Sequence, residues 1–256
     1  ERHGSGGFAL TGTAPLIRVV AHTGSTNEDM KAQALDGENE GVWLRAERQS
    51  AGKGRMGRAW LGEEGNLYAS TLVRLSPADP PAPSLALVVA VAVHEALSEF
   101  TGAGVLILKW PNDGMRLGSA SGEGPAKLCG MLLERAGDTV IIGIGVNITT
   151  APDLPDRHTI SLRDLGAASC DSAHVLERIA ERCAHWLARW RTYGLEPILR
   201  AWQARAHPPG TLLAAELPDG TRVSGLYEGL DQSGALILRL ADGSRHAMHA
   251  GDVFFG

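Results

Sequence analysis

The chain has 256 residues, of which 44% are hydrophobic and 21% are charged. This length suits one large domain with a smaller second one, and the composition suits an ordinary globular core. The formal net charge of −5 argues against a protein that coats nucleic acid with a broad basic surface. The longest apolar run, Leu85–Val93, is far shorter than the roughly 20 residues that cross a bilayer, so no membrane segment is expected.

The cysteines and the N-terminal residues indicate in which cellular compartment the protein is expected. Cys129, Cys170 and Cys183 form no C-x-x-C pair, and an odd number of cysteines offers no disulfide framework. The chain start lacks the charged-then-apolar pattern of a signal peptide, and Glu1–Gly7 is Gly-rich and polar. We therefore expect a cytoplasmic protein whose residues 1–13 are a disordered segment or residues foreign to the fold.

Hydrophobic patterning predicts a mixture of strands and helices up to about residue 207. The predicted strands are Leu16–Val20, Val42–Arg45, Leu67–Val73, Val105–Leu108, Leu128–Glu134 and Thr139–Ile148. The predicted helices are Asn27–Leu35, Leu85–Phe100, a long amphipathic helix that Ser172 should cap, and Glu196–Ala206. Ser25 has capping-box spacing with Glu28. The Leu85–Phe100 helix is apolar on nearly every side, which predicts a central buried helix.

The clearest boundary is His207-Pro208-Pro209-Gly210. After it, short predicted strands are separated by turns at Asp219–Gly220, Ser233–Gly234 and Asp242–Gly243. We therefore expect an α+β protein with a mixed β-sheet domain flanked by helices over residues 14–207. A small β-barrel should follow over residues 208–256. A flexible loop is expected at Gly118–Gly124.

One Gly-rich basic loop, Ser50–Arg58, is a candidate anion-binding site. Within Gly52–Arg58, three glycines interleave with three cations over seven residues. Glycine lets the backbone approach a ligand, and Lys and Arg neutralise phosphate or carboxylate oxygens. The pattern is neither a P-loop nor a Rossmann turn. The alternatives are a solvated basic hairpin or a contact with nucleic acid.

Two segments place a lysine at the end of a strand. In Lys109-Trp110-Pro111-Asn112-Asp113, a lysine and a carboxylate flank a turn after a strand, where ligands often bind. An ordinary structural turn is equally compatible with this segment. Lys127 precedes a strand in which Leu128, Gly130, Leu132 and Glu134 should share one face. That lysine could reach a phosphate, or it could be a lysine snorkelling at an edge.

The strand around Gly143-Ile-Gly145-Val-Asn147 should have two unlike faces. Its isoleucines and Val146 should pack on the core, while Gly143, Gly145 and Asn147 should share the other face. A face without side chains leaves room for a flat ligand, although a bulge or a close helix crossing would also need glycine. Ser25-Thr26-Asn27 could bind a polar head group at a helix start, or could serve as a cap alone.

Taken in this order, the five segments resemble those of the biotin–protein ligase family. The matching segments are Ser25-Thr26-Asn27, Gly52–Arg58, Lys109–Asp113, Lys127-x-x-Gly130-x-Leu132-x-Glu134 and Gly143-x-Gly145-x-Asn147. The resemblance runs from about residue 14 to the end. It implies a biotin/ATP-binding catalytic domain of the class II synthetase-like type, shared with lipoate ligases, and an SH3-like C-terminal domain. The implied type is a biotin–[acetyl-CoA-carboxylase] ligase.

The resemblance also implies a reaction and its partners. Biotin would be adenylated with ATP and Mg²⁺ to biotinyl-5'-AMP. The biotin would then pass to a lysine of the biotin carboxyl carrier protein domain of a carboxylase. The enzyme would be a monomer or a homodimer and would bind no nucleic acid. No metal site of the protein itself is expected, because Mg²⁺ would be carried with ATP, with Asp113 as the nearest candidate carboxylate.

By the same resemblance, the catalytic residues would be Lys127, Arg55 and Asp113. The residues expected to bind biotin are Ser25, Thr26, Asn27, Gln49, Gly52, Gly54, Arg55, Met56, Gly57, Arg58, Trp60, Lys127, Gly130 and Gly145. The residues expected to bind the nucleotide are Arg55, Arg58, Trp60, Asn112, Lys127 and Asn147. Among them, Ser25, Thr26 and Gln49 would hydrogen-bond the ureido head of biotin. The segment Thr149–His158 would fold over adenine.

The sequence departs from the family pattern in places. Lys53 stands where Arg is more usual, which keeps the charge but removes bidentate geometry. Met56 replaces a residue that is often polar or basic, and the segment Leu117–Pro125 is longer than in many members. Because Ser25 comes so early in the sequence, we expect no winged-helix domain before the catalytic part and no repression through DNA binding.

Two other functions compete with this interpretation. A lipoate or octanoate ligase or transferase would share the fold, but the Gly-rich basic loop and Lys109–Asp113 favour biotin. A transferase with a catalytic cysteine is disfavoured because Cys129 lies in a predicted core strand. A nucleic-acid-binding module without enzymatic activity is disfavoured by the acidic net charge and by an aromatic content of 5%.

Overall fold

The computed structural model describes residues 15–60, 64–118, 124–155, 157–217 and 219–255. The expected disordered segment, residues 1–13, and residues 119–123 of the Gly118–Gly124 loop lie outside the described residues.

The strands of the first sheet are β1 (Leu16–Thr23), β2 (Val42–Gln49), β3 (Leu67–Arg74), β4 (Leu106–Lys109), β5 (Asp113–Arg116), β6 (Ala126–Ala136) and β7 (Thr139–Val146). The helices are α1 (Thr26–Leu35), α2 (Leu85–Thr101), α3 (Ser172–Tyr193) and α4 (Glu196–Gln203). The strands of the second sheet are β8 (Leu212–Glu216), β9 (Arg222–Leu230), β10 (Leu236–Arg239), β11 (Arg245–Met248) and β12 (Asp252–Phe255).

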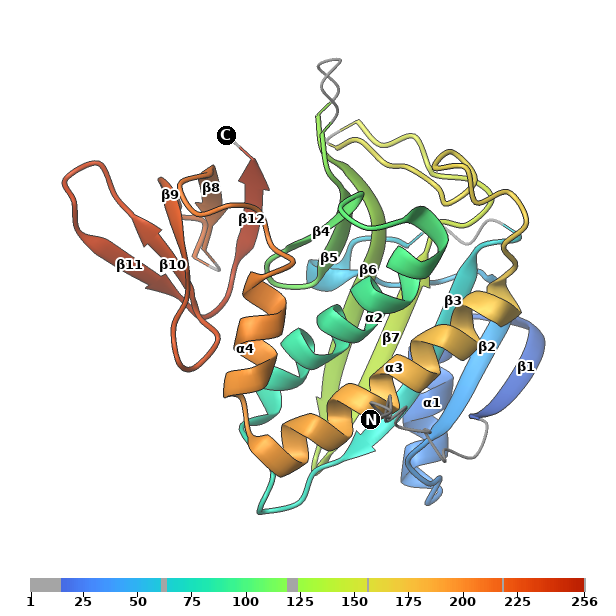
Figure 1. The fold of residues 1–256 in the computed structure, drawn as a ribbon. Helices are drawn as coiled ribbons and strands as arrows, with labels where there is room; N and C mark the ends of the chain where they lie inside the picture. Colours follow the sequence, from blue (N-terminus) through green and yellow to red (C-terminus); the bar gives the residue numbers. More distant parts are fainter. Residues whose placement is uncertain (1–14, 61–63, 119–123, 156, 218, 256) are drawn as a thin grey trace, which may run out of the picture.

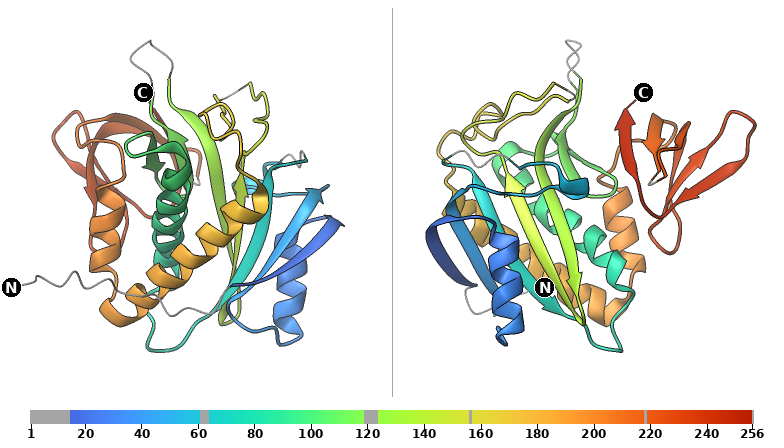
Figure 2. Two further views of the ribbon diagram at one scale, coloured as in Figure 1. Left: turned by 45° about the vertical axis from the view of Figure 1, so that its right-hand side comes forward. Right: turned by 180° about the vertical axis from the view of Figure 1, so that it is seen from behind.

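The first sheet is mixed and lies between helices. Its order is β1-β2-β3-β7-β6-β5-β4, with β1 and β2 parallel and the other neighbours antiparallel. Helices α2 and α3 cover one face, and α1 lies on the opposite face (Figures 1 and 2). This arrangement confirms the predicted α+β class.

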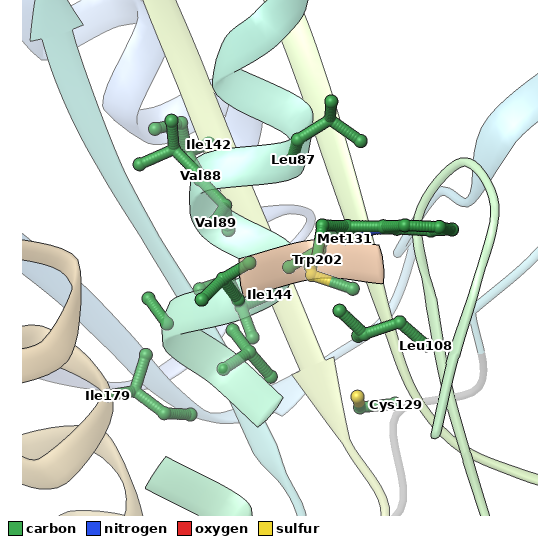
Figure 3. Packing of buried hydrophobic residues seen from close by; sticks show 14 of the residues in the cluster. Leu87, Val88, Val89, Leu108, Cys129, Met131, Ile142, Ile144, Ile179 and Trp202 are labelled. Atoms are coloured by element: carbon green, nitrogen blue, oxygen red, sulfur yellow. The ribbon is translucent and has the colours of Figure 1, made fainter. Parts of the chain in front are cut away.

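Helix α2 forms the centre of the main core. Ten of its 17 residues are buried, which confirms the prediction of a central helix. Figure 3 shows Val88 and Val89 of α2 packed near Ile142 and Ile144 of β7. By length and composition, Ala82–Thr101 is the one described helical segment that could cross a membrane. Its packing against the sheet, α3 and α4 gives a different reason for its apolar composition, because most of the helix is buried in the main core.

The opposite face of the sheet has a much smaller apolar core. Met30 of α1 packs there against Leu44, Leu72 and Ile141. Beyond this cluster, the same face of β7 carries Gly143 and Gly145. Apolar burial therefore holds α1 on the sheet through Met30, in the middle of the helix, and the rest of the face is available for a site.

The C-terminal sheet is antiparallel, in the order β11-β10-β9-β8-β12. This five-stranded sheet agrees with the expected SH3-like C-terminal domain, although no pairing of β11 with β12 among the described residues closes it into a barrel. This sheet packs through Leu213, Tyr227 and Leu236 against the core that α2 and α4 share. Trp110 Nε1 donates a hydrogen bond to Gly234 O across the junction, at 3.2 Å. The boundary at residues 207/208 stays a prediction.

Three local predictions were wrong. Asp171 rather than Ser172 caps α3, because its carboxylate accepts from the His174 N–H at 2.8 Å. Ser25 stands at the N-cap position of α1, but its side chain makes no capping hydrogen bond. The short strand β5 was not expected, since Asp113-Gly114 also suits a turn.

His207 is buried at the junction of the two sheets. Its ring packs edge-to-face on Tyr227, with centroids 4.2 Å apart, and its ring nitrogens have no hydrogen-bond partner among the described residues. Burial, and then the charge of Lys109, lower the pKa of His207 to about 4 from its ordinary 6.5. The neutral form is therefore the one that fits the fold.

We predict that the free energy of unfolding falls as the pH drops from about 6.5 to about 4. In this range His207 is protonated in the unfolded chain but stays neutral in the native protein. The full loss attributable to His207 is about 3 kcal/mol. Urea unfolding across this range measures it, with His207→Phe as the matched variant. The variant should show a shallower pH dependence, and equal slopes in the two proteins would contradict the prediction.

Candidate active site

A cavity of about 440 Å³ opens on the α1 face of the first sheet. All but three of the predicted site residues line it. Those that do are Ser25, Thr26, Asn27, Gln49, Gly54, Arg55, Arg58, Trp60, Asn112, Asp113, Lys127, Gly130, Gly145 and Asn147. The exceptions are Gly52, Met56 and Gly57; Met56 is 69% exposed at the loop tip. The structure therefore gathers most of the predicted residues, which lie far apart in the sequence, around one space.

Lys127 reaches the cavity because β6 contains a β-bulge. Strand β5 pairs Gly114 with Cys129 and Met115 with Lys127, so Leu128 is an extra residue. The bulge brings the Lys127 side chain over Gly130, where a Cβ would lie 3.2 Å from Nζ. Leu128 is fully buried in the main core. The prediction that Leu128 shares a face with Gly130 was therefore wrong.

Asp113 lies between two lysines at the base of the cavity. Its carboxylate is 2.6 Å from Lys127 Nζ and 3.2 Å from Lys109 Nζ. Burial alone would raise the pKa of Asp113, but the two lysines outweigh it and lower the pKa to about 2. The carboxylate thus stays ionised and holds the ammonium groups of Lys109 and Lys127 close together at the base of the cavity. Sequence reasoning placed Lys109 in a motif but did not identify it as a site residue.

The Gly-rich loop is held against the C-terminal sheet. Arg55 and Arg58 both form ion pairs with Asp252 of β12. Arg55 also donates to Gly251 O at 3.1 Å and to Asn112 Oδ1 at 3.3 Å. No sequence pattern singled out Asp252, because its role depends on how the second sheet packs against the first.

The glycines of β7 make room for protein side chains. A Cβ on Gly143 would collide with the Asn27 amide, and one on Gly145 would collide with the Trp60 indole. The Asn27 and Trp60 side chains fill the space directly on the glycines, but Gly143 and Gly145 still line the cavity, so a ligand site on this face stays a prediction. The Trp60 ring is a wall of the cavity, with Lys127 Nζ 5.4 Å from its centroid.

Asn147 ties the end of β7 to the segment that follows it. Its Nδ2 donates to Ile160 O at 3.2 Å and to Lys127 O at 3.4 Å. Pro152, Leu154 and Arg157 of that segment also line the cavity. The Asn147 side chain thus helps to position the segment after β7, which we predicted to lie over the nucleotide.

The cavity wall is strongly cationic. Its described side chains include two carboxylates, Asp113 and Asp252, and six cations: Lys53, Arg55, Arg58, Lys109, Lys127 and Arg157. Such a surface suits a ligand with several negative charges. Each carboxylate pairs with two cations, and no cluster of three or more His, Cys, Asp or Glu occurs among the described residues. The donor set therefore does not fit a magnesium ion held by protein ligands.

The fold and the cavity are accompanied by clear sequence relationships. The chain belongs to the biotin/lipoate A/B protein ligase family, whose model matches residues 19–147. A second model, the biotin protein ligase C terminal domain, matches residues 214–256. These matches confirm the resemblance that the motifs indicated.

Individual relatives cover nearly the whole chain. A biotin–[acetyl-CoA-carboxylase] ligase from Paracoccus denitrificans is 36% identical over 93% of this chain and all of its own length. One from Mycobacterium tuberculosis is 35% identical, over 93% of this chain and 88% of its own length. Among solved structures, a biotin protein ligase from Aquifex aeolicus in complex with biotin and ATP has a TM-score of 0.81. That structure is 24% identical over 94% of this chain and 99% of its own, and it supports the fold.

We predict that Asp252→Ala loosens the Gly-rich loop, because Arg55 and Arg58 lose their shared carboxylate. Trypsin should then cut after Arg55 or Arg58 roughly three- to tenfold faster, since opening the loop costs about 1 kcal/mol less. Glu216→Ala is the matched control, because it removes an exposed ion pair with Arg222 from the same sheet. Equal cleavage rates in both variants would show that Asp252 does not hold the loop.

Proposed function

We propose that this protein is an ATP-dependent ligase that forms biotinyl-5'-AMP and transfers biotin to a specific lysine of a biotin carboxyl carrier protein domain. One observation carries the proposal: a single cavity has a buried polar end at Thr26 and a cationic region around Lys127 and Arg55. The relatives named biotin–[acetyl-CoA-carboxylase] ligase support the choice of biotin and of the acceptor. We take residues 14–207 as the catalytic domain and 208–256 as the C-terminal domain.

The first half-reaction joins two anions. A carboxylate oxygen of biotin forms a bond to the α-phosphorus of ATP, and the bond from that phosphorus to the pyrophosphate oxygen breaks. Lys127 and Arg55 would offset the repulsion and stabilise charge that develops on the α-phosphate. Magnesium would enter on the phosphates of ATP, because both carboxylates in the wall are engaged by cations.

In the second half-reaction, the amine of the acceptor lysine attacks the biotinyl carbonyl carbon. An amide bond forms, the bond from the carbonyl carbon to the AMP oxygen breaks, and the amine loses a proton. Asp113 is a poor general base for that proton, because its pKa is about 2. We assign Asp113 the role of holding Lys109 and Lys127 in place.

The Gly-rich loop would shield the adenylate from water. Arg55 and Arg58 would exchange Asp252 for the carboxylate of biotin and the phosphate as the ligands bind. The segment Thr149–His158 would cover adenine, with Trp60 and Asn147 beside the nucleotide. We further propose a cytoplasmic enzyme that acts as a monomer or a homodimer.

The sister reactions with lipoate or octanoate receive less support from the site. Burial raises the pKa of the Cys129 thiol to about 12, which leaves it unreactive and disfavours a transferase with a cysteine nucleophile. The buried polar side chains of Ser25, Thr26 and Asn27 also suit a head group with hydrogen-bonding atoms better than the apolar chain of such an acid.

We predict that Lys127→Ala lowers biotin-dependent pyrophosphate release by about 10²–10³-fold, because one preorganised charge that faces the reacting phosphate is lost. The measurement is pyrophosphate release from ATP with saturating biotin. Lys31→Ala, which removes an exposed lysine from α1, is the control and should release pyrophosphate normally. A folded Lys127→Ala protein with the parental rate would rule out this role for Lys127.

A further inference from the structure

Asn66 lies directly before β3, and its side chain fixes the chain that leaves β7. Its Oδ1 accepts hydrogen bonds from the backbone N–H groups of Ile148 at 2.8 Å, Thr149 at 2.9 Å and Thr150 at 3.3 Å. Its Nδ2 donates a hydrogen bond to Thr150 O at 2.9 Å. Asn66 is only 4% exposed. One buried amide therefore holds three consecutive residues beyond the end of β7.

This set of contacts requires both halves of an amide. Three N–H groups that converge on one point need an acceptor oxygen, and the neighbouring carbonyl oxygen needs a donor. Asparagine supplies both on adjacent atoms, whereas ionised aspartate has no donor and serine has a single, shorter hydroxyl. The three N–H groups are engaged by protein, so their role is to hold the chain in place.

The backbone next to Asn66 also packs closely on this chain. A Cβ on Gly65 would lie 2.7 Å from Thr149 Oγ1, and the φ of Gly65 is +87°. The Thr149 hydroxyl donates to Glu64 O at 3.2 Å. The start of the segment after β7 is therefore attached to the residues before β3 by backbone as well as by side chain.

The same segment is held again where it returns to β6. The Lys127 N–H donates to His158 O at 2.8 Å, and the Ile160 N–H donates to Lys127 O at 3.0 Å. Between these two attachments, the residues that line the cavity are Pro152, Leu154 and Arg157. Asn66 is not among the residues of the cavity wall. It therefore influences a ligand through the segment that it holds.

We propose that Asn66 is a positioning residue for ATP, which builds the nucleotide part of the cavity wall before the nucleotide binds. It acts through the backbone of residues 148–150 and does not touch the substrates. This inference rests on the proposed function, in which the segment Thr149–His158 covers adenine, and it names a residue outside the cavity that holds this segment. A wall that is already ordered does not have to be ordered by ATP, so the affinity for ATP depends on Asn66.

Asn66→Ala should raise the KM for ATP by about 10- to 100-fold, because the segment loses its attachment at one end and is ordered only when ATP binds. At saturating ATP, kcat should stay within about threefold of the parent, since Lys127 and Arg55 are unchanged. The Kd for biotin should also stay within about threefold, because Asn66 bonds to a segment other than the polar end at Thr26.

A milder variant keeps the test decisive if Asn66→Ala fails to fold. Asn66→Ser retains a hydroxyl that accepts a backbone N–H more weakly than the amide does. It should raise the KM for ATP by about three- to tenfold, again with little change in the Kd for biotin.

A matched control separates positioning from general stability. Ser84 is 3% exposed, and its Oγ accepts a hydrogen bond from Trp190 Nε1 at 2.8 Å, on the face of the sheet that α2 and α3 cover. Ser84→Ala should lower the Tm but leave the KM for ATP within about twofold of the parent. The KM comes from biotin-dependent pyrophosphate release, the Kd from calorimetric titration with biotin, and the Tm from thermal unfolding of each variant.

Two results would overturn the inference while the proposed function stands. One is a folded Asn66→Ala or Asn66→Ser protein with the parental KM for ATP. The other is a loss that is not particular to ATP, either because biotin binding weakens by the same factor or because Ser84→Ala raises the KM for ATP as much as Asn66→Ala does. If the parent itself releases no pyrophosphate in the presence of biotin, the proposed function fails instead.

Discussion

Asp113 and its two lysines connect three strands and both sheets. Two ammonium groups in a largely buried wall repel each other and lose hydration, so they stay together only if an anion lies between them. Asp113 of β5 supplies that anion for Lys109 of β4 and Lys127 of β6. Lys109 also donates to Val253 O of the C-terminal sheet at 2.9 Å. Removing the carboxylate would leave both charges uncompensated, at a cost of roughly 3–5 kcal/mol.

The two ends of the cavity differ in the kind of ligand group that they suit. Near α1, the wall carries the buried polar side chains of Ser25, Thr26 and Asn27, which suit a neutral head group with donors and acceptors. Around Lys127 and Arg55 the wall carries an excess of positive charge, which suits carboxylate and phosphate. Trp60 stands between these ends, over Gly145. A ligand with a polar head and an acidic tail spans both ends.

Patterns along single elements were predictable from the sequence. The alternation in β7 correctly placed Ile142 and Ile144 in the main core, and the apolar composition of α2 predicted its central position. The order of the motifs predicted the family. Features that depend on contacts between distant segments were not predictable. The bulge at Leu128 leaves no mark in a two-residue period, and Asp252 acquires its role only when the second sheet packs near the loop.

The most direct test of the proposed function is pyrophosphate release from ATP by the purified protein, measured in parallel with biotin, with lipoate and without an acid. The cavity predicts release that depends on biotin, because only biotin satisfies both the polar end and the cationic end. Lipoate should give no more than the background rate. Release with lipoate alone, or with neither acid, would contradict the proposal.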